Sequence, residues 1–293
     1  MSVPVAIVDF SWCLYKFRQA YKDIVRTGQD GKFLPAGHVY GTIRVIKELS
    51  QQYKAVILAV DSRSNHRYKI LPEYKSGRHS STGDPYEDYP IMSDLLNILK
   101  ICTYSPNVFY IKHEGMESDD IIASWIRESN TDESKELSCY FNDVDILQVR
   151  GRYHWFRSFH EPEVDRRAYI LNKFGLDLDY LPVWWKVIRG DASDCIPAAM
   201  PRFPSKKLRE ICLSSSCGFD YVTSAGDVMG CWTFLPSDLA ILVNAKRRAV
   251  ERNICMVYPM TVPVSDLKLK RFTCSLADIE ELLGHYEIRD CVL

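Results

Sequence analysis

The chain has 293 residues, of which 46% are hydrophobic and 26% are charged, and its formal net charge is −1. This is ordinary globular composition, with enough length for one large domain or two modest ones, and the near-neutral charge argues against a purely electrostatic nucleic-acid coat. No apolar run reaches the roughly 18 residues that a membrane span needs. The N-terminal segment lacks the basic start and the cleavage site of a signal peptide.

The ten cysteines are scattered from Cys13 to Cys291 without any C-x-x-C pair, and the seven histidines show no metal-ligand spacing. This argues against zinc ribbons and redox motifs. Since nothing indicates secretion, we expect reduced thiols, mostly small core residues, and a cytoplasmic location.

Three apolar runs are typical of buried parallel strands, and each delivers aspartate at its end. VPVAIVDF leads to Asp9, KAVILAVD to Asp61, and ELSCYFNDVD to Asp143 and Asp145. Helical patterns, such as GHVYGTIRVIKELSQQYK and DDIIASWIRES, separate these runs. The alternation of strand and helix predicts a wound α/β domain, in which these aspartates share one edge of the sheet.

The segment GMESDD, residues 115–120, brings Glu117, Asp119 and Asp120 to the same edge, because it follows the strand-like run NVFYIK and opens a helix. Acids in a first helical turn are stabilised by roughly 0.3–1 kcal/mol each, which would explain this segment alone. Seven carboxylates on one edge are costly unless they are neutralised. Oxygen ligands without His or Cys point to Mg²⁺ or Mn²⁺.

The remaining segments are polar or helical. Residues 63–90 are rich in Gly, Pro and Tyr and predict either an ordinary surface loop or a functional excursion from the sheet. A helix pattern over 181–190 precedes Asp191 and Asp194, which caps and turns could explain by themselves. Further helices are expected at PSKKLREIC and over 235–252, the latter ending in KRRAVER.

Six motifs, taken in this order, resemble the 5′→3′ exonuclease/flap endonuclease family over roughly residues 5–197. VDFSWCLYK is similar to its first strand and Tyr-Leu-Tyr-Arg element, and GHVYGTIRVIKEL to its Gly-x-x-Tyr-Gly helix. AVDSRSNHRYKILPEYKSGR resembles its Asp, Arg and Tyr-Lys-x-x-Arg stretch. GMESDD, NDVDILQ and GDASDCIP resemble Gly-x-Glu-Ala-Asp-Asp, Gly-Asp-Lys-Asp-x-x-Gln and Gly-Asp-x-Ser-Asp-Asn-Ile-Pro. The family includes the 5′-nuclease domain of bacterial DNA polymerase I and stand-alone phage enzymes sometimes called phage RNase H.

The resemblance implies a fold and a domain division. Residues 1–185 would form an α/β, PIN-like parallel sheet flanked by helices, with an arch insertion at about 66–105. Residues 186–293 would form a smaller, mainly helical region of the helix-three-turn-helix type that grips duplex DNA.

The resemblance also implies two Mg²⁺ ions, for which Mn²⁺ would substitute, and hydrolysis of a phosphodiester between them. The first ion would use Asp9, Asp61, Glu117, Asp119 and Asp120, and the second Asp143, Asp145, Asp191 and Asp194. Nine carboxylates exceed the direct ligands of two ions, so some would orient water or other ligands. Asp61 and Asp145 are expected to be catalytic.

Basic residues of the same motifs are expected to meet the nucleic acid. Lys75 and Arg78 would stabilise charge in the transition state, with plain surface charge as the alternative. Tyr86 and Tyr89 of the arch would either stack on bases or pack the arch against itself. The expected DNA-binding set is Lys16, Arg67, Tyr74, Lys75, Arg78, Lys206 and Lys207.

The chain departs from the family pattern in two places. Asn142 and Val144 replace the usual Gly and Lys. AAMPRFPSKKLRE stands where the family has a glycine-rich loop, and Pro201 and Pro204 cannot donate an N–H to phosphate. This puts the family's monovalent-cation site in doubt here, and leaves Lys206 and Lys207 as phosphate contacts or as a solvated helix start.

The sequence therefore predicts a Mg²⁺-dependent 5′-nuclease that acts on flaps and on RNA or DNA 5′ ends at branched or nicked duplexes, including RNA primers during replication. We expect a monomer of phage origin, away from membranes, with a single-strand-binding protein or a clamp as partners to test. The alternatives are a PIN-like single-strand ribonuclease, which typically lacks the Tyr-Lys-x-x-Arg and Gly-Asp-x-Ser-Asp elements, and a non-catalytic branched-DNA-binding protein, which would have lost carboxylates.

Overall fold

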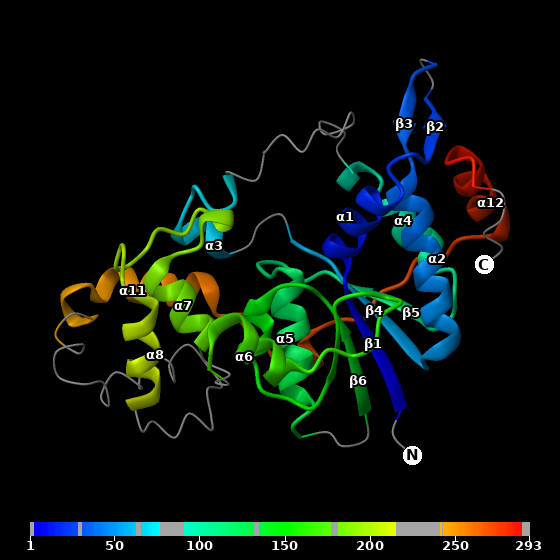
Figure 1. Cartoon of the computed structure of the whole chain (residues 1–293). Helices are drawn as coiled ribbons and strands as arrows, with labels where there is room; N and C mark the ends of the chain where they lie inside the picture. The colour runs from blue at the N-terminus through cyan, green and yellow to red at the C-terminus, as the bar shows by residue number, and fades with distance from the viewer. Residues whose placement is uncertain are drawn as a thin grey trace.

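The computed structural model describes residues 3–28, 31–62, 66–76, 91–131, 135–176, 181–214, 241 and 243–288. Its centre is a five-stranded sheet in the order β5-β4-β1-β6-β7, in which every neighbouring pair is parallel (Figure 1). The strands are β1 (Val3–Asp9), β4 (Ala55–Ala59), β5 (Val108–Ile111), β6 (Lys135–Tyr140) and β7 (His154–Phe156). The predicted α/β class with a parallel sheet is confirmed.

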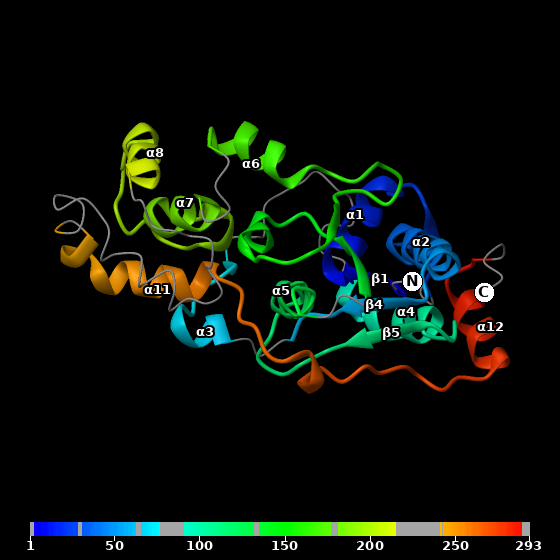
Figure 2. The ribbon, with the colours of Figure 1, turned by 90° about the horizontal axis from the view of Figure 1, so that it is seen from below.

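Side-chain alternation along β1 decides which helices cover which face of the sheet. Ala6 and Val8 pack in one core with α1 (Phe10–Ala20), α2 (Gly37–Gln52) and α4 (Leu95–Cys102). Val5 and Ile7 pack in a second core with α5 (Ser118–Glu128) and the short helix η3 (Val144–Gln148). Figure 2 shows α5 and the α1–α2–α4 group on different sides of the strands. Because both faces are covered, the strands read as nearly continuous apolar runs.

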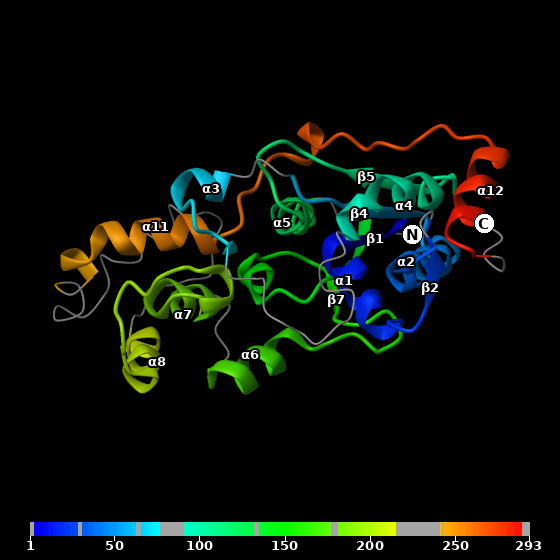
Figure 3. The same cartoon turned by 90° about the horizontal axis from the view of Figure 1, so that it is seen from above.

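The second core continues into a helical part at one end of the sheet (Figure 3). It contains α3 (His66–Ile70), α6 (Arg166–Phe174), α7 (Leu181–Arg189), α8 (Ser205–Ser214) and α11 (Arg247–Val257). The helix predicted over 235–252 has the wrong end, since residues 241 and 243–245 are helical, Lys246 lies in a turn, and α11 then runs on to Val257. Its buried side chains Val250, Ile254 and Val257 extend the apolar stripe past residue 252.

The chain after α11 returns to the sheet. Lys270 pairs with Tyr110 at the edge of β5, and α12 (Leu276–His285) packs near α4. Figure 2 shows this segment running beside β5. It differs from the expected assignment of all residues 186–293 to one helical region, because Ile279 and Tyr286 belong to the core of the α/β part.

Two further points bear on the predictions. Residues 77–90, the middle of the expected arch with Arg78, Tyr86 and Tyr89, lie outside the described residues. A small antiparallel hairpin, β2 (Val25–Thr27) and β3 (Phe33–Pro35), stands between α1 and α2 in the chain. Within the described ranges, no helix is long and apolar enough to cross a membrane.

Candidate active site

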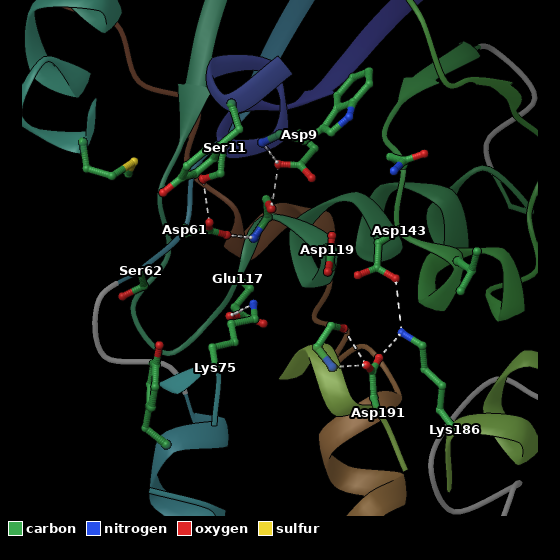
Figure 4. Close-up of a pocket in the computed structure, with 18 of the residues that line it drawn as sticks. Asp9, Ser11, Asp61, Ser62, Lys75, Glu117, Asp119, Asp143, Lys186 and Asp191 are labelled. Carbon is green, nitrogen blue, oxygen red and sulfur yellow. Dashed lines mark hydrogen bonds and ion pairs between the residues drawn. The ribbon is translucent and has the colours of Figure 1, made fainter. Parts of the chain in front are cut away.

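A cavity of about 910 Å³ lies at the carboxyl ends of the strands (Figure 4). Its acidic lining comes from distant parts of the sequence, because each acid follows a strand or caps a helix at the same edge. Asp9 ends β1 and caps α1 by accepting the Trp12 N–H at 3.1 Å. The acids that line the cavity are Asp9, Asp61, Glu117, Asp119, Asp143 and Asp191.

Two serines hold the carboxylates of Asp9 and Asp61 in place. The Ser11 hydroxyl donates to Asp61 Oδ2 at 2.6 Å, and the Ser118 backbone N–H donates to Asp61 Oδ1 at 2.7 Å. The Ser118 hydroxyl donates to Asp9 Oδ1 at 3.0 Å. Sequence reasoning missed both serines. The available signal was their position beside a predicted acid, at the start of α1 and of α5.

Two acids of this first group have a raised pKa. Burial and the neighbouring charge of Asp61 raise the pKa of Asp9 to about 7. Burial, Asp143 and Asp9 raise the pKa of Asp119 well above its ordinary value. Carboxylates that resist ionisation together, with only oxygen donors, suit a hard divalent cation. Within the described ranges, no three His, Cys, Asp or Glu side chains lie close enough together to hold a metal ion as they stand.

Lys75 lies at the cavity and pairs with Glu117, with 2.6 Å between Nζ and Oε1. Its backbone is left-handed, with φ of 59°, which is unfavourable for a lysine. The Lys75 N–H donates to the Asp194 carbonyl at 3.0 Å and helps to hold this conformation. Lys75 is therefore held at the site through its side chain by Glu117 and through its backbone by Asp194. Arg78 lies outside the described residues.

The second acidic group surrounds a lysine that the sequence analysis did not select. Lys186 Nζ lies 2.7 Å from Asp145 Oδ1, 2.8 Å from Asp191 Oδ2 and 3.6 Å from Asp143 Oδ1. A single lysine inside the apolar run VWWKVI of α7 was the signal for it. Figure 4 shows the Lys186 ammonium between Asp143 and Asp191.

The three carboxylates that pair with Lys186 do not have their pKa values shifted in the same direction. For Asp143 and Asp191, burial raises the pKa, but the attraction of Lys186 outweighs it and the pKa is lowered. For Asp145, burial and the charge of Asp143 prevail over Lys186 and raise the pKa to about 7. The pKa of Lys186 is itself raised because the three carboxylates outweigh its desolvation.

Asp120 does not serve as a direct metal ligand in this arrangement. It is fully buried, and Arg67 binds both its oxygens, with Nη1 2.9 Å from Oδ2 and Nη2 2.8 Å from Oδ1. The backbone N–H groups of Glu117 and Met260 also donate to this carboxylate. The predicted ligand role of Asp120 is therefore wrong. It anchors the start of α5 to α3 and to the segment after α11.

Burial also contradicts two of the expected DNA contacts. Arg67 is 3% exposed. Its guanidinium pairs with Asp120 and Glu117 and donates to the Met256 carbonyl. Tyr74 is 4% exposed, and its hydroxyl donates to Glu117 Oε2 at 3.0 Å. In this structure both side chains are therefore buried and bonded within the protein.

The other predicted residues lie in or near the site. Asp145 and Asp194 are buried beside the cavity, with Asp194 Oδ2 3.5 Å from the Tyr74 hydroxyl. Lys16 lies over the ring of Trp12, which lines the cavity, and donates to the Arg157 carbonyl. On α8, Lys206 is exposed and Lys207 half-buried.

The sequence matches the family described as "5'-3' exonuclease, N-terminal resolvase-like domain" over residues 4–175. The chain belongs to this family. The 5'-3' exonuclease of Aquifex aeolicus (strain VF5) is 24% identical over 170 residues, which cover 57% of this chain and 55% of that protein. DNA polymerase I of Bacillus subtilis (strain 168) is 25% identical over 166 residues, 54% of this chain and 18% of the polymerase. The matched part is thus just over half of the exonuclease.

Solved structures show the same fold over nearly the whole chain. The T5 5'-exonuclease with bound zinc superimposes with a TM-score of 0.61 at 16% identity, over 97% of this chain and 98% of that chain. A T5 flap endonuclease complex with DNA and metal ions gives 0.61 at 15% identity, over 97% and 99%. The family predicted from the six motifs is confirmed, which places the chain among nucleases.

Proposed function

We propose that this chain is a Mg²⁺-dependent, structure-specific 5′-nuclease that hydrolyses phosphodiesters at 5′ flaps and at 5′ ends of RNA or DNA on duplex junctions. The biological role that we propose is removal of RNA primers at replication forks. The observation that supports it most is one cavity that gathers six acids from β1, β4, α5, η3 and the end of α7 beside Lys75. The family supplies the reaction class, and the polarity and substrate belong to the proposal.

The residues of the chain have separable tasks in this proposal. Two divalent cations would activate water and stabilise the charge on the phosphate and on the leaving oxygen. Asp9, Asp61 and Asp119 would hold one such ion, and Ser11 and Ser118 keep the carboxylates of Asp9 and Asp61 oriented. Lys186 keeps Asp143 and Asp191 ionised and close together, so that three acids and one lysine still leave a negative group for a cation.

Lys75 would stabilise the transition state. Its ammonium lies on the cavity and pairs with Glu117, and its backbone N–H donates to the Asp194 carbonyl. A scissile phosphate entering the cavity would meet this ammonium beside the acids, and a preorganised positive charge stabilises developing negative charge. Lys206 and Lys207 would contact the duplex from α8, and Lys16 the 5′ strand near Trp12.

The test is cleavage of a 5′-labelled flap duplex in Mg²⁺ and in EDTA, beside a 3′-flap duplex and a single-stranded RNA of the same sequence. We expect metal-dependent cutting near the 5′-flap junction, with the 3′ flap intact. Cutting of the single-stranded RNA alone would identify a PIN-like ribonuclease instead. Binding of the flap without any cutting would identify a non-catalytic branched-DNA-binding protein.

A matched pair of variants ties the activity to the cavity. Asp9→Asn removes one charge inside the cavity, and Asp165→Asn removes one from the exposed cap of α6. Both change a helix-capping aspartate to asparagine, which still accepts a hydrogen bond. Only Asp9→Asn is expected to abolish cutting. Equal activity of the two variants would exclude the cavity as the active site.

A further inference from the structure

A buried polar network joins three distant segments on the α1–α2–α4 side of the sheet. Its centre is Asp94, which is 5% exposed and directly precedes α4. His38 Nε2, from the start of α2, lies 2.8 Å from Asp94 Oδ2. The Tyr286 hydroxyl, from the end of α12, donates to Asp94 Oδ1 at 2.8 Å. Asn97 of α4 donates to the same hydroxyl at 3.1 Å.

The C-terminal segment is held in this position by the hairpin. The Arg26 guanidinium lies over the Tyr286 ring, 5.2 Å from its centroid. The Thr27 N–H donates to Glu287 Oε1 at 3.0 Å. Tyr286 is 1% exposed, so its hydroxyl reaches Asp94 through the interior of the protein.

The network is two residues away from the wall of the cavity. Asp94 closes the short helix η2 (Ile91–Ser93), because its N–H donates to the Ile91 carbonyl at 3.2 Å. Ile91 is 2% exposed and anchors the turn in the core. Met92, between them, lines the cavity. This turn belongs to the predicted arch at about 66–105 and directly follows the residues 77–90 that the structure does not describe.

We propose that Tyr286 and His38, acting through Asp94, are positioning residues that fix the 91–94 turn and thereby the Met92 wall of the active site. Docking of the C-terminal segment is then a requirement for the correct shape of the site, although Tyr286 touches neither substrate nor metal. The physical reason is that a buried carboxylate which loses a donor draws its segment toward water. The effect on cleavage rests on the proposed function, whereas the effect on the turn does not.

The experiment compares Tyr286→Phe with Tyr53→Phe. Both remove a hydroxyl from a partly or fully buried tyrosine, but the Tyr53 hydroxyl bonds to the Tyr140 hydroxyl at 2.9 Å, and no hydrogen bond found among the described residues joins it to the 91–94 turn. Each change is made with and without Met92→Cys, and the rate of maleimide labelling at position 92 is measured by peptide mass spectrometry. Free thiols elsewhere, such as Cys255, serve as internal references.

We expect Tyr286→Phe to raise the labelling rate at position 92 by about tenfold, which corresponds to the loss of one hydrogen bond to a charged group. Tyr53→Phe should leave that rate unchanged. On the flap substrate, Tyr286→Phe should lower kcat/KM while Tyr53→Phe does not, at equal loss of thermal stability. Asn97→Ala, which loosens the Tyr286 hydroxyl without leaving the carboxylate unpaired, should shift labelling in the same direction by less.

Equal labelling at position 92 in the two tyrosine variants would overturn the positioning role. If the unmodified chain cuts no flap, the proposed function fails, and the labelling result still decides whether Tyr286 fixes the turn. If labelling rises but kcat/KM stays unchanged, the turn does not control the active site and the inference is wrong.

Discussion

The two acidic groups of the cavity handle the same problem of like charge in different ways. The group of Asp9, Asp61 and Asp119 has serine and backbone donors, and the pKa of Asp9 rises to about 7. The group of Asp143, Asp145 and Asp191 contains an internal cation, Lys186, which lowers the pKa of two of its members. Burial and mutual repulsion therefore prevail at Asp9 in the first group, whereas in the second group Lys186 offsets part of the negative charge.

The largest expected effect comes from the group with the lysine. Asp145→Asn removes a carboxylate 2.7 Å from Lys186 and should reduce kcat by about 10³-fold or more, because two-metal hydrolysis tolerates no loss in its ligand set. Flap affinity, measured by fluorescence anisotropy in Ca²⁺, should change little. Cleavage that survives within about tenfold would remove Asp145 from the catalytic group.

Lys75→Ala tests the cation that faces both groups. Loss of a preorganised charge at the phosphate should lower kcat by about 10²–10³-fold with a much smaller effect on Kd. Single-turnover kinetics separate the two. Lys69→Ala, at an exposed lysine of α3, is the matched control. A parallel loss of rate and affinity in Lys75→Ala would reduce Lys75 to a docking contact.

Lys186→Met tests the difference between the two acidic groups directly. It removes the internal cation from the second group, so that this group resembles the first. Removing one partner from a buried ion-pair group should cost about 3 kcal/mol in the free energy of unfolding at pH 8 in EDTA. Added Mg²⁺ should recover more of this stability in the variant than in the unmodified chain. Denaturant titrations with and without Mg²⁺ measure both quantities, and equal Mg²⁺ stabilisation in the two proteins would contradict a cation-like role for Lys186.

The raised pKa values also predict a pH dependence of the stability in EDTA. Asp9 and Asp145 have a pKa of about 7 in the folded chain against 3.8 ordinarily, so the folded state holds more protons than the unfolded state between about pH 4 and 7. Stability should therefore fall as the pH rises through this window. The Tm measured at pH 5.5 and at pH 8 checks this.

Two variants locate the source of that pH dependence. Asp9→Asn should flatten the fall in Tm, because it removes one of the groups whose raised pKa makes the folded chain release a proton in this window. Asp278→Asn should leave the fall as it is, because Asp278 is a surface cap whose pKa is lowered by the Ser275 donors and titrates below the window. A Tm that rises between pH 5.5 and pH 8 would mean that Asp9 and Asp145 are ionised in the folded chain.

Sequence reasoning succeeded where residues act at the end of a strand. Apolar runs fix the parallel strands, and the rule that their carboxyl ends share an edge brings Asp9, Asp61 and Asp143 together without any coordinates. The helix-capping position of Glu117 follows from the same local rule. These predictions needed only periodicity and chain order, which are properties of the sequence itself.

Sequence reasoning failed where partners come from remote elements. Arg67 and Asp120 both match a nuclease motif, and nothing local distinguishes a buried pair from two residues that face a substrate. Only the packing of α3 against α5 buries them together. Lys186 stands 41 residues beyond Asp145 in the chain, so its role as a common partner of three acids is a product of how α7 meets η3.

The sequence by itself determined the family, the parallel sheet and the edge where the acids gather, because alternation, strand ends and caps are short-range. The tertiary structure alone decided which acids remain available to a cation and which are paired with Arg67 or Lys186. It also decided that the last segment runs from α11 past β5 to Asp94. Those outcomes depend on long-range burial and charge pairing, whose free energies are set by neighbours that the local sequence does not specify.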